Sequence, residues 1–249
     1  MSRQLTLTDR EFQFAVRLRL NLPPDDFTTA STQCICGFTL HNDPYHALCC
    51  LKISAIERHN QVKELFAQCA SKLFITCSRE PAGWCSSDNK RPDLLIHFTH
   101  KQTFVDITIV HPTAKSNLRK ATDNGRVCRE AEHHKIEKYK EITLSNSAFQ
   151  FCPLVFTTFG EWGRQTAELI EELAVVGADD YCPYDSLDLR PELAHSCAVA
   201  IQRGNARMHH EMLMKIAHFN VNKQVRIGPQ RRVQTQQTQR VILQQAGEA

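Results

Sequence analysis

Net charge and long apolar segments are both scarce in this sequence. Its 30 lysine and arginine residues nearly balance 27 acidic residues, which leaves a formal net charge of +3. Charge alone therefore does not indicate nucleic-acid binding, and any basic surface must be local. No uninterrupted apolar run approaches the roughly 20 residues that a membrane-spanning helix needs. We therefore expect no membrane partner.

A secretory signal is also missing, because the first four residues lead directly into an amphipathic pattern. The chain has 11 cysteines, an odd number that does not suggest a set of paired disulfides. These two features together predict a reducing compartment. The remaining composition, 42% hydrophobic and 23% charged over 249 residues, is typical of one sizeable globular core with an appended module.

Two short runs, DLLIHF (93–98) and TFVDITIV (103–110), are typical of neighbouring strands joined by a polar connection. Alternation of side chains along the second run separates two faces, one with Val105, Ile107 and Ile109 and the other with Phe104, Asp106 and Thr108. An unpaired carboxylate in the middle of a buried strand is unfavourable. Asp106 therefore requires a positively charged partner.

A divalent metal ion would be one such partner. Asp93 opens the first run, and a strand, turn and strand can bring it beside Asp106. Two hard oxygen ligands in this arrangement suit Mg²⁺ or Mn²⁺ rather than zinc. The plainer alternative is that Asp93 only begins a strand after Pro92 and that Asp106 forms a salt bridge.

A helix is predicted from residue 126 to about residue 144. The residues that share one arc of roughly 120° on this helix are Cys128, Ala131, Glu132, Lys135, Lys138, Tyr139 and Ile142. The opposite side is fully charged, as expected for a solvated face. Lysines that point toward a core need an acidic partner, so we expect Lys135 and Lys138 to approach Asp93 and Asp106.

The combination of RPD (91–93), VDIT (105–108) and KIEKY (135–139) resembles the PD-(D/E)xK superfamily of metal-dependent nucleases. It is most similar to the restriction-like endonuclease that follows the reverse transcriptase in some non-LTR retrotransposons. Further segments resemble the same region in the same order: EFQFAVRLRLNLP, CICG, HALCC, ERHN, REP, FCPLVFTTFG and IQRGNA. The resemblance extends from about residue 9 to about residue 208.

This resemblance implies a magnesium-dependent DNA endonuclease of retrotransposon origin that nicks its target site. The implied catalytic residues are Asp93, Asp106, Lys135, Lys138 and, as a third carboxylate, Glu80; the two aspartates would bind the Mg²⁺ ion. The superfamily pattern has a lysine two residues after the second acid, where this chain has Thr108. In the retrotransposon branch the following helix supplies that lysine. The alternative is an inactive nucleic-acid-binding module on a nuclease scaffold.

A second group of candidate ligands precedes these strands. Cys34, Cys36 and His46, with either Cys49 or Cys50, place two soft or borderline ligands at each end of a loop, which suits a tetrahedral structural zinc. The alternative is a set of buried thiols in a cysteine-rich chain. The resembled region carries a zinc knuckle with the same C-x-C, H, C order, and Cys50 fits its last ligand best.

Candidate nucleic-acid contacts are Arg58, His59 and Asn60, at the start of a helix predicted over 54–71, and Arg91. The first three could contact a phosphate, or they could cap the helix and form surface hydrogen bonds. The resemblance implies DNA as the partner, a reverse transcriptase of the same or a related element as a second partner, and a nuclear location.

Periodicity predicts the order helix, strand, strand, strand, helix, strand from residue 54 to residue 158, which is the αβββαβ order of the resembled superfamily. We therefore predict an α/β fold with a restriction-endonuclease-like core and a mixed sheet at 53–175. An N-terminal helix and zinc knuckle precede it (1–52). A helical extension follows (176–219), in which residues 191–219 are predicted to form a helix pair interrupted near Gly204, with His209 and His210 on the surface. A flexible, basic, glutamine-rich tail ends the chain (220–249).

Overall fold

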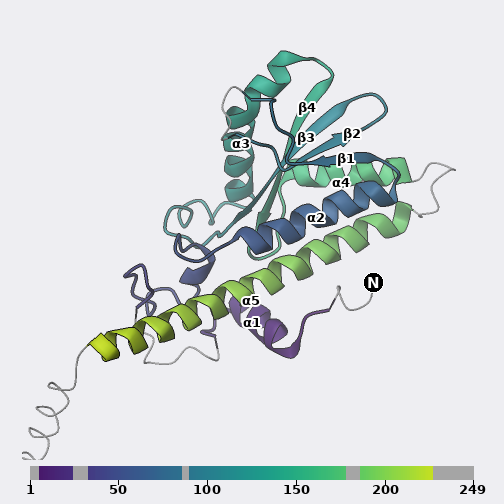
Figure 1. Ribbon diagram of the computed structural model, residues 1–249. Helices are drawn as coiled ribbons and strands as arrows, with labels where there is room; N and C mark the ends of the chain where they lie inside the picture. The colour runs from purple at the N-terminus through teal and green to yellow at the C-terminus, as the bar shows by residue number, and fades with distance from the viewer. Residues whose placement is uncertain (1–5, 25–32, 86–89, 178–185, 227–249) are drawn as a thin grey trace, which may run out of the picture.

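The computed structural model describes residues 6–24, 33–85, 90–177 and 186–226, which form an α/β fold around a four-stranded mixed sheet (Figure 1). The elements in chain order are α1 (Asp9–Arg19), a 3₁₀ helix (His46–Leu48), α2 (Ile56–Lys72), β1 (Thr76–Arg79), β2 (Leu94–His97), β3 (Gln102–Val110), α3 (Arg126–Ser145), β4 (Phe149–Thr157), α4 (Arg164–Gly177) and α5 (Ser186–Arg226). The predicted order from α2 to β4 is confirmed. None of the described helices combines the length and apolarity that a membrane crossing requires.

The sheet has the strand order β1-β2-β3-β4. β1 pairs antiparallel with β2, and β2 pairs antiparallel with β3, so neither pair needs a crossover connection. β4 is parallel to β3 and needs a crossover, which α3 provides. This crossover places α3 on one face of the sheet, and α2 and α4 lie on the other (Figure 1).

The predicted division of β3 into two faces is confirmed. Val105 and Ile107 belong to the main core, which α2, α4 and the first half of α5 complete. Phe104 instead packs with Tyr139 and Ile142 beneath α3. Asp106 lies two residues after Phe104 on the same strand and therefore faces α3.

α5 is a single helix of 41 residues, so the predicted interruption near Gly204 is wrong. Gly204 marks a close contact between helices instead. A Cβ atom added there would lie 2.5 Å from Cγ and 2.6 Å from Cβ of Arg58 on α2. A glycine signals either a break or a close approach, and the sequence alone does not distinguish them. The beginning of the predicted tail, residues 220–226, also belongs to α5, and residues 227–249 lie outside the described residues.

The second half of α5 packs against the N-terminal part of the chain. A separate apolar cluster joins Phe14 and Leu18 of α1 to Met208 and Met212 of α5, and it includes Leu48 of the 3₁₀ helix. Figure 1 shows α5 running past α2 and then past α1. One helix therefore contacts both the sheet-bearing core and the cysteine-rich segment.

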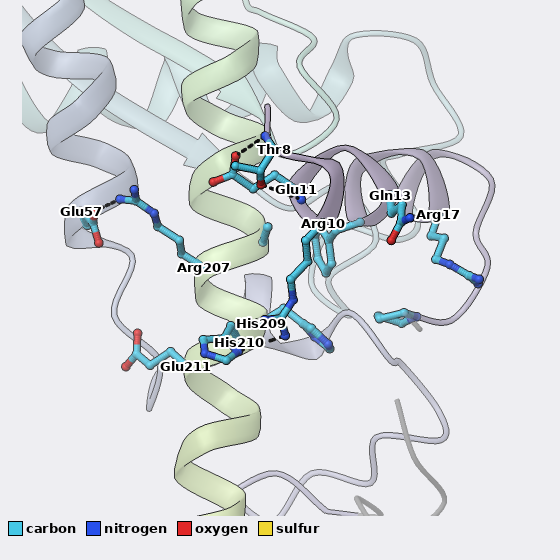
Figure 2. A pocket seen from close by; sticks show the side chains of 13 residues that line it. Thr8, Arg10, Glu11, Gln13, Arg17, Glu57, Arg207, His209, His210 and Glu211 are labelled. Atoms are coloured by element: carbon cyan, nitrogen blue, oxygen red, sulfur yellow. Dashed lines mark hydrogen bonds and ion pairs between the residues drawn. The ribbon is translucent and has the colours of Figure 1, made fainter. Parts of the chain in front are cut away.

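A cavity of about 620 Å³ lies between α1 and α5 (Figure 2). Arg10 donates to Nδ1 of His210 across it at 3.2 Å, and Arg207 pairs with Glu57 at its rim. None of the predicted site residues lines this cavity. His209 is buried against the Phe14 ring, which corrects its predicted surface position.

Buried polar groups connect α2, α5 and the ends of β3 and β4. Arg58 donates to Asn205 Oδ1 at 2.6 Å, and Asn205 donates to the Thr158 carbonyl at 2.8 Å. Nδ1 of His111 is hydrogen bonded to the Thr158 hydroxyl at 2.7 Å. Burial, assisted by the charges of Arg58 and His46, lowers the pKa of His111 to about 4. His111 is therefore neutral in the folded protein at neutral pH.

The close contact at Gly204 leads to a stability prediction. Alanine favours a helix over glycine by about 1 kcal/mol, yet in Gly204→Ala the new methyl group must displace the Arg58 stem. We expect a net loss of about 1–3 kcal/mol in the free energy of unfolding, measured by urea denaturation. Ser196→Ala, on the same helix, is the control and should be nearly neutral. A Gly204→Ala variant as stable as the wild type would contradict the described packing.

The low pKa of His111 predicts acid sensitivity. Between pH 6.5 and pH 4 the unfolded chain binds a proton at this histidine and the folded chain does not, so the stabilisation is complete above pH 6.5 and is lost as the pH falls. The expected loss is about 3 kcal/mol. His111→Gln should flatten the dependence of unfolding free energy on pH across this window. His41→Gln, at an exposed position, should leave the dependence unchanged.

Candidate functional sites

Three carboxylates lie in one row across β1, β2 and β3. The strand registers pair Arg79 with Leu94 and Leu94 with Val105. Continuing each register by one residue pairs Glu80 with Asp93 and Asp93 with Asp106. Asp93 therefore lies between the other two acids. The Glu80 N–H donates to the Asp93 carbonyl and the Asp93 N–H donates to the Val105 carbonyl, each at 2.8 Å. The antiparallel hairpins therefore gather acidic residues that are far apart in the sequence.

Asp106 is the most buried member of this row, with 5% of its surface exposed. Lys135 Nζ lies 2.5 Å from Oδ2, and Lys138 Nζ lies 3.8 Å from Oδ1. The Tyr139 hydroxyl donates to Oδ1 at 2.6 Å. All three partners come from consecutive turns of α3, so the expected approach of the helix lysines to an aspartate is observed. Their charge compensates the desolvation of the carboxylate.

Asp93 is held by different groups. Its Oδ2 accepts a hydrogen bond from the Ile107 N–H at 2.6 Å and from His59 Nε2 at 3.0 Å. The hydrogen bond to Asp93 raises the pKa of His59, and burial only partly opposes this effect. His59 belongs to α2. The partner of Asp93 therefore comes from α2, whereas the partners of Asp106 come from α3.

Glu80 completes the row at the edge of the sheet, and its side chain is 60% exposed. Its backbone has φ of 50°, an uncommon conformation for a non-glycine residue. Lys63, one helical turn after His59, donates to Glu80 Oε1 at 2.6 Å. This hydrogen bond lowers the pKa of Glu80. Each acid of the row therefore has its own basic partner.

The ligand atoms of these three acids do not all lie within 4.8 Å of one another. Among the described residues, two groups do have all their ligand atoms within 4.8 Å of one another. One is Cys34, Cys36, His46 and Cys50, and the other is Asp43, His46 and Cys49. The acidic row is therefore a charge-balanced cluster of acids and bases rather than a closed cage of carboxylates.

The predicted nucleic-acid contacts have different environments. Arg58 is only 3% exposed and its guanidinium is bonded inside the protein, so its predicted phosphate contact is wrong. His59 points to Asp93, and Asn60 is exposed and lies 3.4 Å from the His59 ring. Arg91 is exposed beside the row, and its carbonyl oxygen lies 2.8 Å from the Tyr139 hydroxyl.

Two residues of the site were missed by sequence reasoning. Tyr139 had been placed in the apolar stripe of its helix, although a tyrosine there also brings a hydroxyl that needs a partner. Lys63 carried a weaker signal: it follows His59 by four residues and therefore shares its helix face. The strained backbone of Glu80 has no equivalent signal in the sequence.

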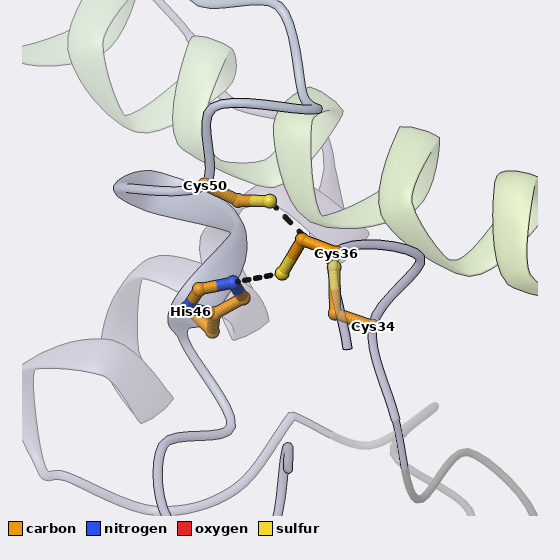
Figure 3. Close-up of side chains that lie close together, drawn as sticks. All are labelled: Cys34, Cys36, His46 and Cys50. Atoms are coloured by element: carbon orange, nitrogen blue, oxygen red, sulfur yellow. Dashed lines mark hydrogen bonds between the residues drawn. The ribbon is translucent and has the colours of Figure 1, made fainter. Parts of the chain in front are cut away.

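The cysteine-rich segment brings four ligands together (Figure 3). Cys34 Sγ lies 3.6 Å from Cys50 Sγ, and Cys36 Sγ lies 3.1 Å from His46 Nε2. All four ligand atoms are within 4.8 Å of one another. Gly37, with φ of 89°, turns the chain between the two pairs. This cluster could hold a structural metal such as zinc.

Two of the four ligands, Cys36 and His46, are shifted toward the forms that bind metal, whereas burial raises the pKa of Cys34 to about 12. Burial alone would raise the pKa of Cys36, but hydrogen bonds from the Phe38 N–H and from the Cys34 and Cys50 thiols outweigh it and lower that pKa. Burial lowers the pKa of His46. A thiolate and a neutral imidazole are the forms that bind zinc.

The structure also distinguishes Cys49 from Cys50, the two candidates for the fourth ligand. Cys50 is buried beside Cys34, as the order of ligands predicted. Cys49 is exposed and lies 3.9 Å from Nδ1 of His46, on the other side of the ring. Nε2 of the same ring faces Cys36. Cys50 is therefore the fourth ligand of the cluster.

Comparison of the chain with protein-family models gives no match, and comparison with curated proteins gives none either.

The cluster leads to a prediction on metal content. Cys36→Ser should remove the metal ion and lower the melting temperature, because the ligand loop contributes Cys34 and Cys50 to the apolar cluster under α5. Cys49→Ser is the matched control and should keep both the metal and the melting temperature. Elemental analysis and thermal unfolding measure the two quantities. Equal metal content in Cys36→Ser and the wild type would contradict the assignment.

Proposed function

We propose that this chain is a metal-dependent endonuclease that hydrolyses phosphodiester bonds in DNA. The observation that carries the proposal is the environment of Asp106, a buried carboxylate bonded to Lys135 and next to Asp93 on the neighbouring strand. A buried charge cluster of this kind costs desolvation energy that a purely structural core avoids. A buried cluster of charged side chains is therefore a candidate for a functional site.

The fold supports the same proposal. The order α2, β1, β2, β3, α3, β4 and the mixed sheet agree with the αβββαβ core of restriction-like endonucleases. Asp93 immediately precedes β2 and Asp106 lies in β3, so the two acids come from adjacent segments of the sheet. We propose the restriction-endonuclease-like fold on this basis.

The donor set is compatible with Mg²⁺ or Mn²⁺. Magnesium is usually bound by one or two carboxylates together with water and substrate phosphates, not by an all-protein cage. Asp93 and Asp106 supply hard oxygen ligands from adjacent strands, and a DNA phosphate would supply the remainder. An ion bound there would polarise the phosphate and lower the pKa of the attacking water.

The protein side chains would take separate parts in the reaction. Lys135 is 23% exposed at its side chain, so its ammonium reaches both Asp106 and the solvent side of the site. From there it can orient the attacking water or neutralise charge on the phosphate. Glu80 and Arg91 lie at the exposed end of the row, where Arg91 would contact the DNA backbone.

The proposal also covers the origin, the cellular location and the partner of this chain. The resemblance to the nuclease region of non-LTR retrotransposons supports a retrotransposon origin, target-site nicking, a nuclear location and a reverse transcriptase as partner. The knuckle with Cys34, Cys36, His46 and Cys50 precedes the nuclease core in the same order as in that region.

A nucleic-acid-binding module without catalysis is the second candidate function. Two observations favour it: Thr108 stands where the superfamily has its strand lysine, and every acid of the row already has a basic partner. The Thr108 hydroxyl oxygen is buried and has no hydrogen-bond partner among the described residues. It cannot supply the positive charge of a lysine.

Nicking of supercoiled plasmid in the presence of Mg²⁺ or Mn²⁺ tests the proposal. We expect Asp106→Asn to reduce the rate by about 100-fold or more, because it removes a metal-binding carboxylate. Lys135→Ala should reduce it by about 100-fold or more, because it removes the group that orients the water or neutralises the phosphate. Asp123→Asn is the matched control, since Asp123 is an exposed, ion-paired aspartate near the start of α3.

The same assay distinguishes the two candidate functions. Wild-type protein that binds DNA but does not nick it with either ion would overturn the endonuclease and favour the binding module. Nicking that persists in Asp106→Asn would identify a contaminating nuclease and would equally contradict the proposed site.

A further inference from the structure

The Tyr139 hydroxyl lies at a junction of the acidic row. It is 2.6 Å from Asp106 Oδ1 and 2.8 Å from the Arg91 carbonyl oxygen, and Lys138 Nζ donates to it at 2.8 Å. The side chain is fully buried, and its ring lies 4.7 Å from the Phe151 ring. Packing therefore fixes the ring, and the ring fixes the position of the hydroxyl.

The hydroxyl has one proton for two acceptors. A charged acceptor forms the stronger hydrogen bond, so the proton goes to Asp106 rather than to the Arg91 carbonyl. The lone pairs of the same oxygen accept from Lys138. Tyr139 therefore fixes Oδ1 of Asp106 and the Lys138 ammonium at the same time.

This junction gives the two lysines of α3 different positions. Lys135 is paired directly with Oδ2 of Asp106 at 2.5 Å. Lys138 is 3.8 Å from Oδ1, lies 4.4 Å from the centre of the Tyr139 ring, and has the more exposed side chain, 38% against 23%. Lys138 is thus held near the carboxylate without forming its closest ion pair.

We propose that Tyr139 is the positioning residue of the site, holding Asp106 in its ligand orientation and keeping Lys138 off that carboxylate and toward the DNA phosphate. The inference rests on the proposed endonuclease function and extends it, because it assigns Lys135 to Asp106 and Lys138 to the substrate. Without the hydroxyl, Lys138 would be free to form a second ion pair with Oδ1, where a metal ion would have to displace it.

Tyr139→Phe tests this role, because it keeps the ring and removes only the hydroxyl. We expect kcat for plasmid nicking to fall by about 10- to 100-fold and KM for DNA to change by less than about twofold. The double variant Tyr139→Phe with Lys138→Ala should lose less than the product of the two single effects, since both act through one contact.

Tyr45→Phe is the matched control. The Tyr45 hydroxyl donates to the Leu22 carbonyl at 2.5 Å, and the side chain is equally buried, but it lies in the cluster under α5. A loss of activity that only reflects a weakened fold would appear in both variants. A loss confined to Tyr139→Phe reflects the acidic row.

A second measurement does not depend on catalysis. The Mn²⁺-induced rise in melting temperature of the zinc-loaded protein should be absent in Asp106→Asn and should need about tenfold more Mn²⁺ in Tyr139→Phe. Lys138→Ala in the Tyr139→Phe background should restore part of the Mn²⁺ affinity, because the competing ammonium is removed.

The outcomes separate the two proposals. An active wild type with a Tyr139→Phe variant within about twofold of it overturns the positioning role and leaves the endonuclease intact. An inactive wild type whose Mn²⁺ response weakens in Tyr139→Phe overturns the endonuclease and supports the positioning role. An Mn²⁺ response that is unchanged in Tyr139→Phe, or absent from the wild type, overturns the positioning role.

Discussion

The buried carboxylate of Asp106 is the constraint on which the rest of the structure depends. A charge in the middle of a central strand is stable only if compensating charge reaches it inside the protein. Lys135 does so from α3, the crossover that the parallel pairing of β3 and β4 requires. Sheet topology and site electrostatics therefore depend on the same helix. Apolar residues of similar volume could satisfy the fold without this pair, and the proposed function rests on that point.

The N-terminal turn of α2 connects this site to the opposite side of the protein. Two successive residues face different partners: Arg58 is bonded to Asn205 beside Gly204 on α5, and His59 is bonded to Asp93. The position of α5 therefore helps to determine where His59 meets the acidic row. The same α5 packs against the cysteine-rich cluster through Met208. The candidate metal centre and the acidic row share a single rigid element.

Strong local patterns made much of this arrangement predictable. The alternation around Asp106 gave the correct face of β3, and the helical stripe gave the correct direction of Lys135, because both periodicities are properties of the backbone. Features that depend on contacts between distant segments were not predictable. Gly204 was interpreted as a helix break, although it accommodates Arg58. Arg58 was interpreted as a phosphate contact because nothing local shows that α5 covers it. His59 and Lys63 gave no sign of which acids they would meet.

The small side chain of Thr108 is consistent with the positions of the α3 lysines. A lysine at this strand position would share the face of Asp106, where Lys135 and Lys138 already bring two ammonium groups within 4 Å of the carboxylate. A third ammonium would add repulsion, because the neighbouring acid, Asp93, is already paired with His59. The smaller threonine avoids that repulsion, and its buried hydroxyl leaves the carboxylate to the helix lysines. The carboxylate of Asp106 is therefore compensated from α3, with the Tyr139 hydroxyl between Lys138 and Asp106.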